Sequence, residues 1–303
     1  MTSAPGSEFR SGFAAIVGRP NVGKSTLLNR LVGHKLAIVS DKPQTTRTRI
    51  LGVVHLPGAQ IVLVDTPGVH RPRHRLGEQM VRVARAALSE VEVILFVTDA
   101  AAGPPGPGDR FLAEQLAPLP APVVLVLNKV DRVPGDRAAE LLDAYRALGD
   151  FHAALPVSAL TGRNLDRLLE TIVDLLPPGP RYFPEDQLTD QPERRIIAEF
   201  IREQVLHLTR EEVPHAVAVV VEEIQDRGER PTYVRAVIYV EREAQKGILI
   251  GERGRLLKEV GSRARRELEN LLGTRLYLDL WVKVKRDWRN RPGSLQEFGY
   301  DEP

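Results

Sequence analysis

The sequence feature that most constrains the fold is a glycine-containing loop near the N-terminus, Gly18–Ser25. Its eight residues, GRPNVGKS, match the pattern GxxxxGK[ST]. The run before it, Phe13–Val17, is short and apolar, as expected of a buried strand, and Ser25–Leu31 has helical spacing. The glycines let the backbone turn several N–H groups and the helix N-terminus toward one point, which suits a phosphate group. The loop therefore predicts a strand–loop–helix unit that binds phosphate.

Around this unit, residues 13–176 alternate between short apolar runs and runs with helical spacing. The apolar runs are rich in Val and Ile, as in strands buried on both faces of a parallel sheet, and lie at Phe13–Val17, Ile61–Val64, Val93–Val97 and Val123–Leu127. Helical spacing occurs at Ser25–Leu31, Leu76–Leu88, Arg137–Leu148 and Asn164–Leu176. This alternation predicts an α/β domain whose open, mostly parallel sheet carries helices on both faces.

The domain boundary is indicated by a stretch rich in proline and turn residues. The last helical run stops at Pro177-Pro178-Gly179-Pro180, and polar residues continue to Pro192. We therefore expect a first domain at 10–177, a flexible linker at 178–192, a second domain at 193–290 and a C-terminal tail at 291–303. The second domain has the order helix, strand, strand, helix, helix, strand, which predicts a smaller α+β unit.

Composition excludes several classes of site. The 303 residues contain no cysteine, so disulfides, thiolate metal sites and cysteine nucleophiles are absent. Residues 1–10 lack a basic stretch followed by an apolar core, and no apolar run approaches the roughly 18 residues that cross a bilayer. We therefore expect a cytoplasmic protein, attached at most to a membrane surface. The net charge is only +2, so a case for nucleic acid must rest on local basic clusters.

The phosphate loop and a second motif together indicate which nucleotide the chain binds. In the phosphate loop, Lys24 should reach the β- and γ-phosphates, and the Ser25 hydroxyl should bind Mg²⁺. Asn128-Lys129-Val130-Asp131 follows a buried run, so its side chains project from the carboxyl edge of the sheet. Asp131 can accept hydrogen bonds from guanine N1–H and the exocyclic amine, which adenine does not present together. Asn128 would hold the loop and base, and the Lys129 stem would cover the ring. The two motifs together predict a GTP site.

Three further segments complete this site. Asp65-Thr66-Pro67-Gly68 ends a buried run, which places Asp65 near Mg²⁺ and the Gly68 N–H near the γ-phosphate. Thr45 or Thr46 should close over Mg²⁺ when the γ-phosphate is present, making 39–49 a mobile switch, and we favour Thr46. A backbone N–H of Ser158-Ala159-Leu160 could contact the guanine carbonyl. The predicted GTP-binding residues are Gly18, Arg19, Pro20, Asn21, Val22, Gly23, Lys24, Ser25, Thr26, Thr45, Thr46, Asp65, Thr66, Pro67, Gly68, Asn128, Lys129, Asp131, Ser158, Ala159 and Leu160. The predicted Mg²⁺ ligands are Ser25, Thr46 and Asp65.

These motifs resemble the five motifs of the translation-factor-like GTPases. Arg19-Pro20-Asn21 and Gln44-Thr45-Thr46-Arg47 are similar to the Era and MnmE branch. In that branch the asparagine that matches Asn21 can bind K⁺, whose charge would act as an arginine finger does. Val69 stands where Ras-type relatives carry a water-positioning glutamine. An apolar side chain cannot orient a water, so we expect hydrolysis to be slow or to use another group.

Two histidines follow Val69 in the sequence. His70 and His74 lie in the second switch, close to the γ-phosphate by sequence. A general-base role is conceivable, but we favour exposed loop histidines.

The second domain contains a candidate nucleic-acid loop. Ile248–Gly254 joins an apolar helix end to a Gly-x-x-Gly turn and a second helix, and this order resembles a type II KH domain. Basic residues cluster at 246–266 and again at 283–291, as expected for phosphate binding. The predicted RNA-binding residues are Ile250, Gly251, Glu252, Arg253, Gly254, Lys258, Arg263, Lys283 and Lys285. Trp281 and Trp288 could stack on bases, or they could pack in the interior.

Over residues 10–300 the chain resembles the Era family, GTPases with a C-terminal KH domain. The resemblance implies binding to the 3′ end of 16S rRNA, a role in assembling the 30S subunit and peripheral association with the inner membrane. We also expect a monomer. The alternative is a signalling GTPase whose C-terminal domain binds protein rather than RNA. A third hypothesis, a metabolic nucleotide kinase, is disfavoured by Asn128–Asp131 and by the lack of an evident acceptor site.

Overall fold

The computed structural model describes residues 8–42, 44–68 and 74–300. The first domain is built on a six-stranded sheet of order β2-β3-β1-β4-β5-β6, in which β2 is antiparallel to β3 and all other neighbours are parallel. Its strands are β1 (Arg10–Val17), β2 (Ile50–Leu56), β3 (Ala59–Asp65), β4 (Val93–Asp99), β5 (Val123–Asn128) and β6 (Ala153–Pro156). The predicted α/β domain with a mostly parallel sheet is confirmed.

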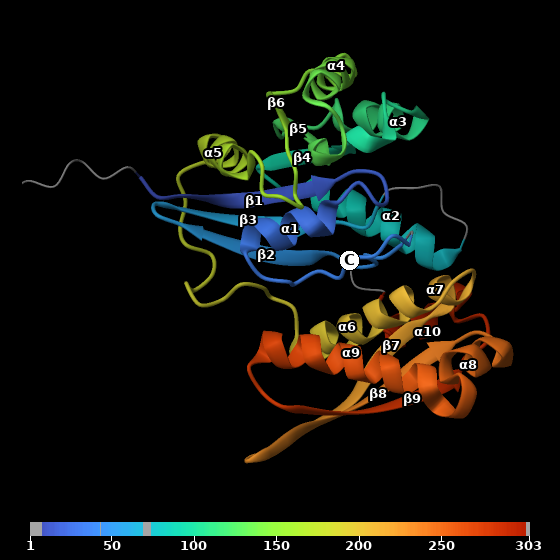
Figure 1. The fold of residues 1–303 in the computed structure, drawn as a ribbon. Helices are drawn as coiled ribbons and strands as arrows, with labels where there is room; N and C mark the ends of the chain where they lie inside the picture. Colours follow the sequence, from blue (N-terminus) through green and yellow to red (C-terminus); the bar gives the residue numbers. More distant parts are fainter. Residues whose placement is uncertain (1–7, 43, 69–73, 301–303) are drawn as a thin grey trace, which may run out of the picture.

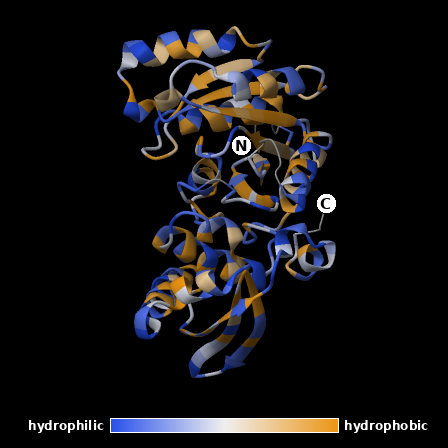
Figure 2. Cartoon of the chain, turned by 90° about the vertical axis from the view of Figure 1, so that its right-hand side faces the viewer, coloured by the Kyte–Doolittle hydropathy of each residue, from blue (hydrophilic) through white to orange (hydrophobic). Residues whose placement is uncertain are grey.

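Helices cover both faces of this sheet (Figure 1). They are α1 (Lys24–Val32), α2 (Arg75–Leu88), α3 (Pro107–Leu116), α4 (Gly135–Arg146) and α5 (Leu165–Leu175), with short 3-10 turns η1 (Ala100–Ala102) and η2 (Val130–Arg132). Because strand side chains alternate between faces, Leu95 packs with α1 and α5, whereas its neighbour Phe96 packs with α3 and α4. The strands are mostly apolar along their whole length (Figure 2), as burial on both faces requires.

The second domain is a three-stranded sheet with helices packed on one face and the C-terminal residues Trp288, Leu295 and Phe298 packed against the other. Its elements are α6 (Glu193–Leu208), α7 (Val213–Ala216), β7 (Ala218–Arg227), β8 (Arg230–Val240), α8 (Glu243–Ile250), η3 (Glu252–Gly254), α9 (Arg255–Leu272), β9 (Leu276–Val284), η4 (Trp288–Asn290) and α10 (Pro292–Glu297). The strand order is β7-β8-β9, antiparallel between β7 and β8 and parallel between β8 and β9. Apolar residues of α6, α8 and α9 form one core with the sheet. The predicted smaller α+β unit is confirmed.

The connection between α5 and α6, which contains the expected linker 178–192, forms hydrogen bonds with the first domain. Backbone and side-chain hydrogen bonds tie it to β2 and β3: Val53 N–H donates to Leu188 O at 2.8 Å, and the Thr189 hydroxyl donates to Leu51 O at 2.7 Å. The buried Gln60 side chain accepts from Tyr182 N–H and donates to Phe183 O, each at 2.8 Å. The edge of the sheet therefore holds the connection in place, since an edge strand offers unpaired polar groups.

The last described residues, 288–300, pack against both domains. Trp288, Leu295, Phe298 and Tyr300 form an apolar cluster with Leu76 and Met80 of α2. Trp288 is fully buried and its indole N–H donates to Ala216 O at 2.8 Å, so it packs in the interior and is closed to base stacking. Trp281 is 56% exposed. In the described residues, no helix is long and apolar enough to cross a membrane.

Candidate nucleotide site and nucleic-acid groove

The loop between β1 and α1 curls around its own lysine. Gly23 directly precedes α1 with φ 100°, a left-handed conformation that strains other residues, and a Cβ there would lie 2.4 Å from the Asn128 side-chain nitrogen. The buried Lys24 Nζ donates to Gly18 O at 3.2 Å and Arg19 O at 3.0 Å. Burial lowers the pKa of Lys24 to about 8, while the nearby Asp65 opposes this shift. A buried cation that donates to two carbonyls is prepared to meet an anion.

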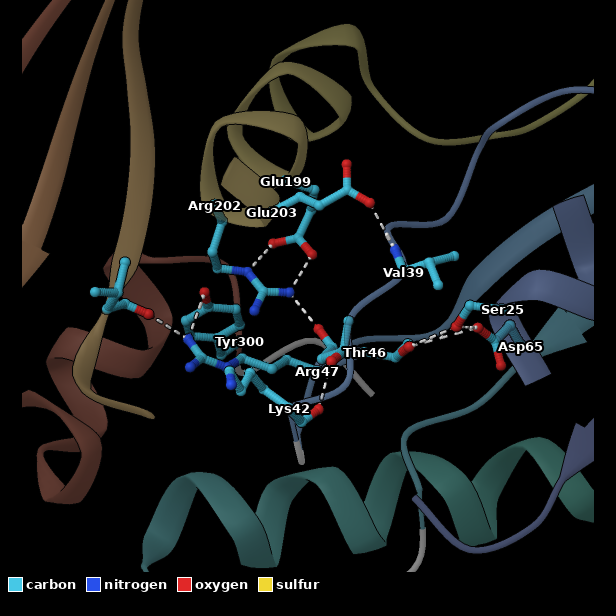
Figure 3. A network of polar contacts seen from close by, with 12 residues as sticks. Ser25, Val39, Lys42, Thr46, Arg47, Asp65, Glu199, Arg202, Glu203 and Tyr300 are labelled. Carbon is cyan, nitrogen blue, oxygen red and sulfur yellow. Dashed lines mark hydrogen bonds and ion pairs between the residues drawn. The ribbon is translucent and has the colours of Figure 1, made fainter. Parts of the chain in front are cut away.

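Ser25, Thr46 and Asp65 converge at one point, although they come from three separate segments (Figure 3). The Ser25 hydroxyl donates to Asp65 Oδ2 at 2.6 Å and lies 3.0 Å from the Thr46 hydroxyl, which lies 3.5 Å from Asp65 Oδ2. The Thr45 hydroxyl instead donates to Lys42 O at 2.6 Å. The structure therefore places Thr46, and not Thr45, beside Ser25 and Asp65.

One oxygen of this cluster has no partner. Asp65 is fully buried, and its Oδ1 lacks a hydrogen bond within the described residues. Burial raises the pKa of Asp65 to about 6, and the positive charge of Lys24 limits the rise. An unpaired buried carboxylate oxygen is costly unless a cation or donor meets it. Two hydroxyls and this carboxylate form an all-oxygen set, the kind of donor set that Mg²⁺ prefers, so the residues present fit that ion.

The end of β5 connects the phosphate loop to the loop after β6. The buried Asn128 amide donates to Val22 O and accepts from Ala159 N–H, each at 2.9 Å. Lys129 Nζ donates to Asn21 O at 2.6 Å. The exposed Asp131 carboxylate accepts from the buried Ser158 hydroxyl at 2.5 Å. Asp131 is therefore oriented by a neighbour and still open to a further donor.

A pocket of about 320 Å³ lies over this region. Of the predicted residues it is lined by Pro20, Asn21, Gly23, Lys24, Ser25, Thr26, Thr45, Thr46, Gly68 and Lys129. The remaining predicted residues, Gly18, Arg19, Val22, Asp65, Thr66, Pro67, Asn128, Asp131, Ser158, Ala159 and Leu160, do not line it. The Leu160 side chain is 66% exposed, and Thr66 is buried with its hydroxyl donating to Ile16 O at 2.9 Å. Val69 and His70 lie outside the described residues, and His74 directly precedes α2.

Two placements in and around the pocket were not foreseen. Arg19 Nε forms a salt bridge with the buried Asp109 of α3 at 2.8 Å, so its guanidinium is turned toward α3. Residues Ile38–Asp41 and Arg132 also line the pocket. Arg132 could have been found as the residue after the guanine motif. Val39–Asp41 lie within the predicted switch 39–49 but were absent from the predicted GTP-binding set, and their position depends on contacts with the second domain.

In the second domain, the Gly-x-x-Gly turn lies between α8 and α9. Gly251 has φ 69°, and a Cβ there would lie 2.9 Å from Leu256 Cβ, so this position requires glycine. Glu252 and Arg253 are exposed, and Arg253 has φ 52°. Ile250 ends α8. A groove of about 420 Å³ starts at Gly254 and runs between α9 and β9, lined by Gly254, Leu257, Lys258, Gly261, Ser262, Arg265, Tyr277, Leu278 and Leu280.

The structure brings only some of the predicted basic residues to this groove. Lys258 lines it, whereas Arg263 is paired with Glu259 at 2.7 Å, Lys283 with Glu222 at 3.3 Å, and Lys285 with Glu297. Arg265 and the 57% exposed Tyr277 line the groove but were absent from the predicted set. Helical spacing from Gly254 through Lys258 and Gly261 to Arg265 is the signal that would have found Arg265.

Known proteins match both domains. Residues 13–129 match the family model of 50S ribosome-binding GTPases, and residues 212–289 match that of the KH domain. The GTPase Era of Heliobacterium modesticaldum is 53% identical over 295 residues, which cover 97% of this chain and 98% of the relative. The chain belongs to the Era family of GTPases. It is therefore a GTPase with a P-loop domain followed by a KH domain.

Two Era crystal structures match the fold closely. Era in complex with MgGDPNP and nucleotides 1506–1542 of 16S ribosomal RNA has a TM-score of 0.94 at 46% identity and covers 97% of this chain and 100% of its own. A variant of Aquifex aeolicus Era bound to GDP and AlF4⁻ has a TM-score of 0.93 at 45% identity, with the same coverage. The KH domain that the matches place at the C-terminus argues against a metabolic kinase.

Proposed function

We propose that this Era-family GTPase is a GTP-controlled switch that binds the 3′ end of 16S rRNA through its KH groove during assembly of the 30S subunit. The observation that carries the proposal is the groove behind Gly251–Gly254, lined by Lys258, Arg265 and Tyr277, in the same chain as a guanine-type nucleotide site. Cations and an aromatic ring beside a turn of this kind suit a single-stranded nucleic-acid backbone and its bases. The Era complex with 16S rRNA nucleotides supports the identity of the RNA.

At the nucleotide site, we assign Lys24 to the β- and γ-phosphates and Asp131 to the edge of guanine. Ser25, Thr46 and Asp65 would hold Mg²⁺, an assignment supported by the unpaired Asp65 Oδ1 and by the Mg²⁺ in the Era complex with MgGDPNP. Bound there, Mg²⁺ would neutralise charge that builds up on the phosphates. Asn128 would keep the phosphate loop and the base loop in register through its two 2.9 Å bonds.

Slow hydrolysis follows from Val69, which offers no group to orient a water. Asn21 is a candidate K⁺ ligand, as in the related branch. It lines the pocket, and its amide nitrogen donates to Asp41 O at 2.7 Å, which leaves the amide oxygen as the atom for a cation. The test is the rate of GTP hydrolysis in K⁺ against Na⁺: stimulation by K⁺ that is lost in Asn21→Ala supports the assignment, and equal rates refute it.

The RNA function is tested at the tip of the turn. Glu252 and Arg253 are exposed and lie far along the chain from the nucleotide site. The double variant Glu252→Asp, Arg253→Asp places a second negative charge where the RNA backbone should lie, so it should abolish binding of a 16S 3′-end oligonucleotide while GTP hydrolysis is kept. Unchanged RNA binding would instead favour the alternative, a signalling GTPase whose second domain binds protein.

We further propose a cytoplasmic monomer, with peripheral contact to the inner membrane as the family resemblance implies. Support for a membrane-surface rather than a spanning mode comes from the described helices, none of which could cross a bilayer. Sedimentation of the purified chain alone tests whether it is a monomer, and sedimentation with anionic vesicles tests the membrane contact.

A further inference from the structure

The segment between α1 and β2 lies between the nucleotide pocket and the KH domain. We define residues 36–42 and 44–47 as the switch segment. Ile38 is buried within the apolar core of the KH domain. Glu203 of α6 accepts from Val39 N–H at 2.8 Å, and His207 donates its Nε2–H to Val39 O at 2.9 Å. Since Val39 also lines the pocket, the same residues face the nucleotide and the second domain.

At the end of the switch segment, two consecutive side chains point to opposite sides. Thr46 points to Ser25 and Asp65, whereas the next residue, Arg47, points into the KH domain (Figure 3). The carbonyl of Thr45 accepts a hydrogen bond from the fully buried Arg202 of α6, which is paired with Glu199 at 2.5 Å. The adjacent residues Thr46 and Arg47 therefore contact two different sites, the nucleotide site and the KH domain.

Arg47 is held by backbone carbonyls at the end of a short helix. Its guanidinium donates to Val217 O at 2.6 Å and, more weakly, to Pro214 O at 3.5 Å and His215 O at 3.4 Å, which are carbonyls at the end of α7. It also lies 5.6 Å from the ring centres of Trp288 and Tyr300. Cations favour such orphan carbonyls and aromatic faces.

Burial of the Arg47 guanidinium is costly in free energy unless the KH domain is docked on the switch segment. Arg47 is only 3% exposed, and among the described residues its Nε has no hydrogen-bond partner and no carboxylate forms a salt bridge with it. If the switch segment moved Thr46 away from Asp65, the guanidinium would leave the Val217 carbonyl, and a buried acceptor would lose its donor. The contacts of Thr46 and Arg47 should therefore form and break together.

We propose that Arg47 is a positioning residue that makes docking of the KH domain and closure of Thr46 over the Mg²⁺·GTP site a single coupled event. The inference rests on the proposed function and deepens it, because it names the contact through which nucleotide state reaches the RNA-binding domain. Coupling between two sites is reciprocal, so a chain without this contact should lose selectivity for GTP as well as nucleotide-dependent docking.

The first test compares Arg47→Ala and Arg47→Lys with Arg49→Ala. Arg49 is the matched control because it lies two residues further along, carries the same charge and is exposed. Arg47→Ala should weaken binding of a non-hydrolysable GTP analogue with Mg²⁺ by about 10-fold, within the usual range for coupling between sites, and should leave GDP affinity within about twofold. The affinity of Arg47→Lys for the GTP analogue should lie between those of the parent and Arg47→Ala, because lysine keeps the positive charge but lacks the forked guanidinium. Equal losses for the analogue and GDP would indicate a structural role and overturn the proposal.

A double-mutant cycle with Thr46→Ala distinguishes positioning from general destabilisation. If Arg47 acts through Thr46, the double variant should bind the GTP analogue no more weakly than Thr46→Ala alone. Additive losses would contradict the proposal, even if each single variant folds.

Domain docking can be measured directly because the chain has no native cysteine. Cysteines at the exposed positions Glu114, on α3, and Glu229, at the β7–β8 turn, would carry a fluorescence donor and acceptor. In the parent and Arg49→Ala chains, transfer efficiency should differ between GTP analogue and GDP, and this difference should vanish in Arg47→Ala. A parent difference that survives in Arg47→Ala overturns the role of Arg47. The absence of a difference in the parent would instead overturn nucleotide-controlled presentation itself.

Discussion

At the scale of single residues, Asp65 lies at the proposed Mg²⁺ site, and burial of its carboxylate destabilises the folded chain. Its carboxylate is fully buried with one unpaired oxygen, and burial raises its pKa to about 6. A folded-state pKa above the unfolded value means that stability is lost as pH rises through about 6. The nucleotide-free chain should therefore lose stability as the pH rises from about 4 to about 6.

Asp65→Asn should remove this pH-dependent loss and raise the unfolding temperature at pH 7.5, because a neutral amide costs less to bury. It should also abolish the Mg²⁺ dependence of GTP-analogue binding. Thermal unfolding without nucleotide and binding titrations with and without Mg²⁺ check the two effects. A less stable variant at pH 7.5 would contradict the account.

Asp131 should control base choice without affecting stability, because it is exposed and accepts only the Ser158 hydroxyl. Asp131→Asn should weaken GTP binding at least about 100-fold, since guanine donors lose their acceptor. It should improve binding of xanthosine triphosphate, whose C2 carbonyl can accept from the new amide. Competition titrations with both nucleotides check this.

The unfolding temperature of Asp131→Asn should equal that of the parent. Asn128→Ala should lower the unfolding temperature, because it leaves Val22 O and Ala159 N–H unpaired.

At the scale of elements, the turn between α8 and α9 offers a matched pair of glycines. Gly251→Ala forces a left-handed residue against Leu256 and should cost about 1–3 kcal/mol of stability and most of the RNA affinity. Gly247 lies inside α8 with open space around its Cα, so Gly247→Ala should stabilise the domain by about 0.5–1 kcal/mol. Chemical denaturation and RNA titration compare the two, and equal effects would show that the turn geometry is unimportant.

Elements marked by a local pattern were predicted well from the sequence, and elements defined by distant contacts were not. The phosphate loop and the guanine motif each follow a short buried strand, so their place at the sheet edge could be inferred. The edge strand β2 was missed because Gly52 and His55 interrupt its apolar pattern, and α3 because glycine and proline precede it. Thr46 was favoured over Thr45, but the sequence alone does not decide between them, because only the backbone direction, set by Arg47 and Arg202, distinguishes them.

At the scale of the whole molecule, the expected tail and linker both join the domains. Leu295 and Phe298 cluster with α2, and Tyr300 meets Arg47. A chain truncated after Arg291 should keep GDP binding, because none of the described residues 292–300 lines the nucleotide pocket. Its domains should separate, so small-angle scattering should give a larger radius of gyration than for the full chain. An unchanged radius would show that the C-terminal cluster does not hold the domains together.

The central claim is that bound GTP controls how the KH groove is presented to RNA. Its most direct test is crosslinking of the full chain to RNA, loaded with either a GTP analogue or GDP, followed by identification of the bound sequence. The account predicts crosslinks at the 3′ end of 16S rRNA, at residues of the groove such as Lys258 and Tyr277, and more of them with the GTP analogue. Equal crosslinking in both nucleotide states, or crosslinks away from the groove, would contradict it.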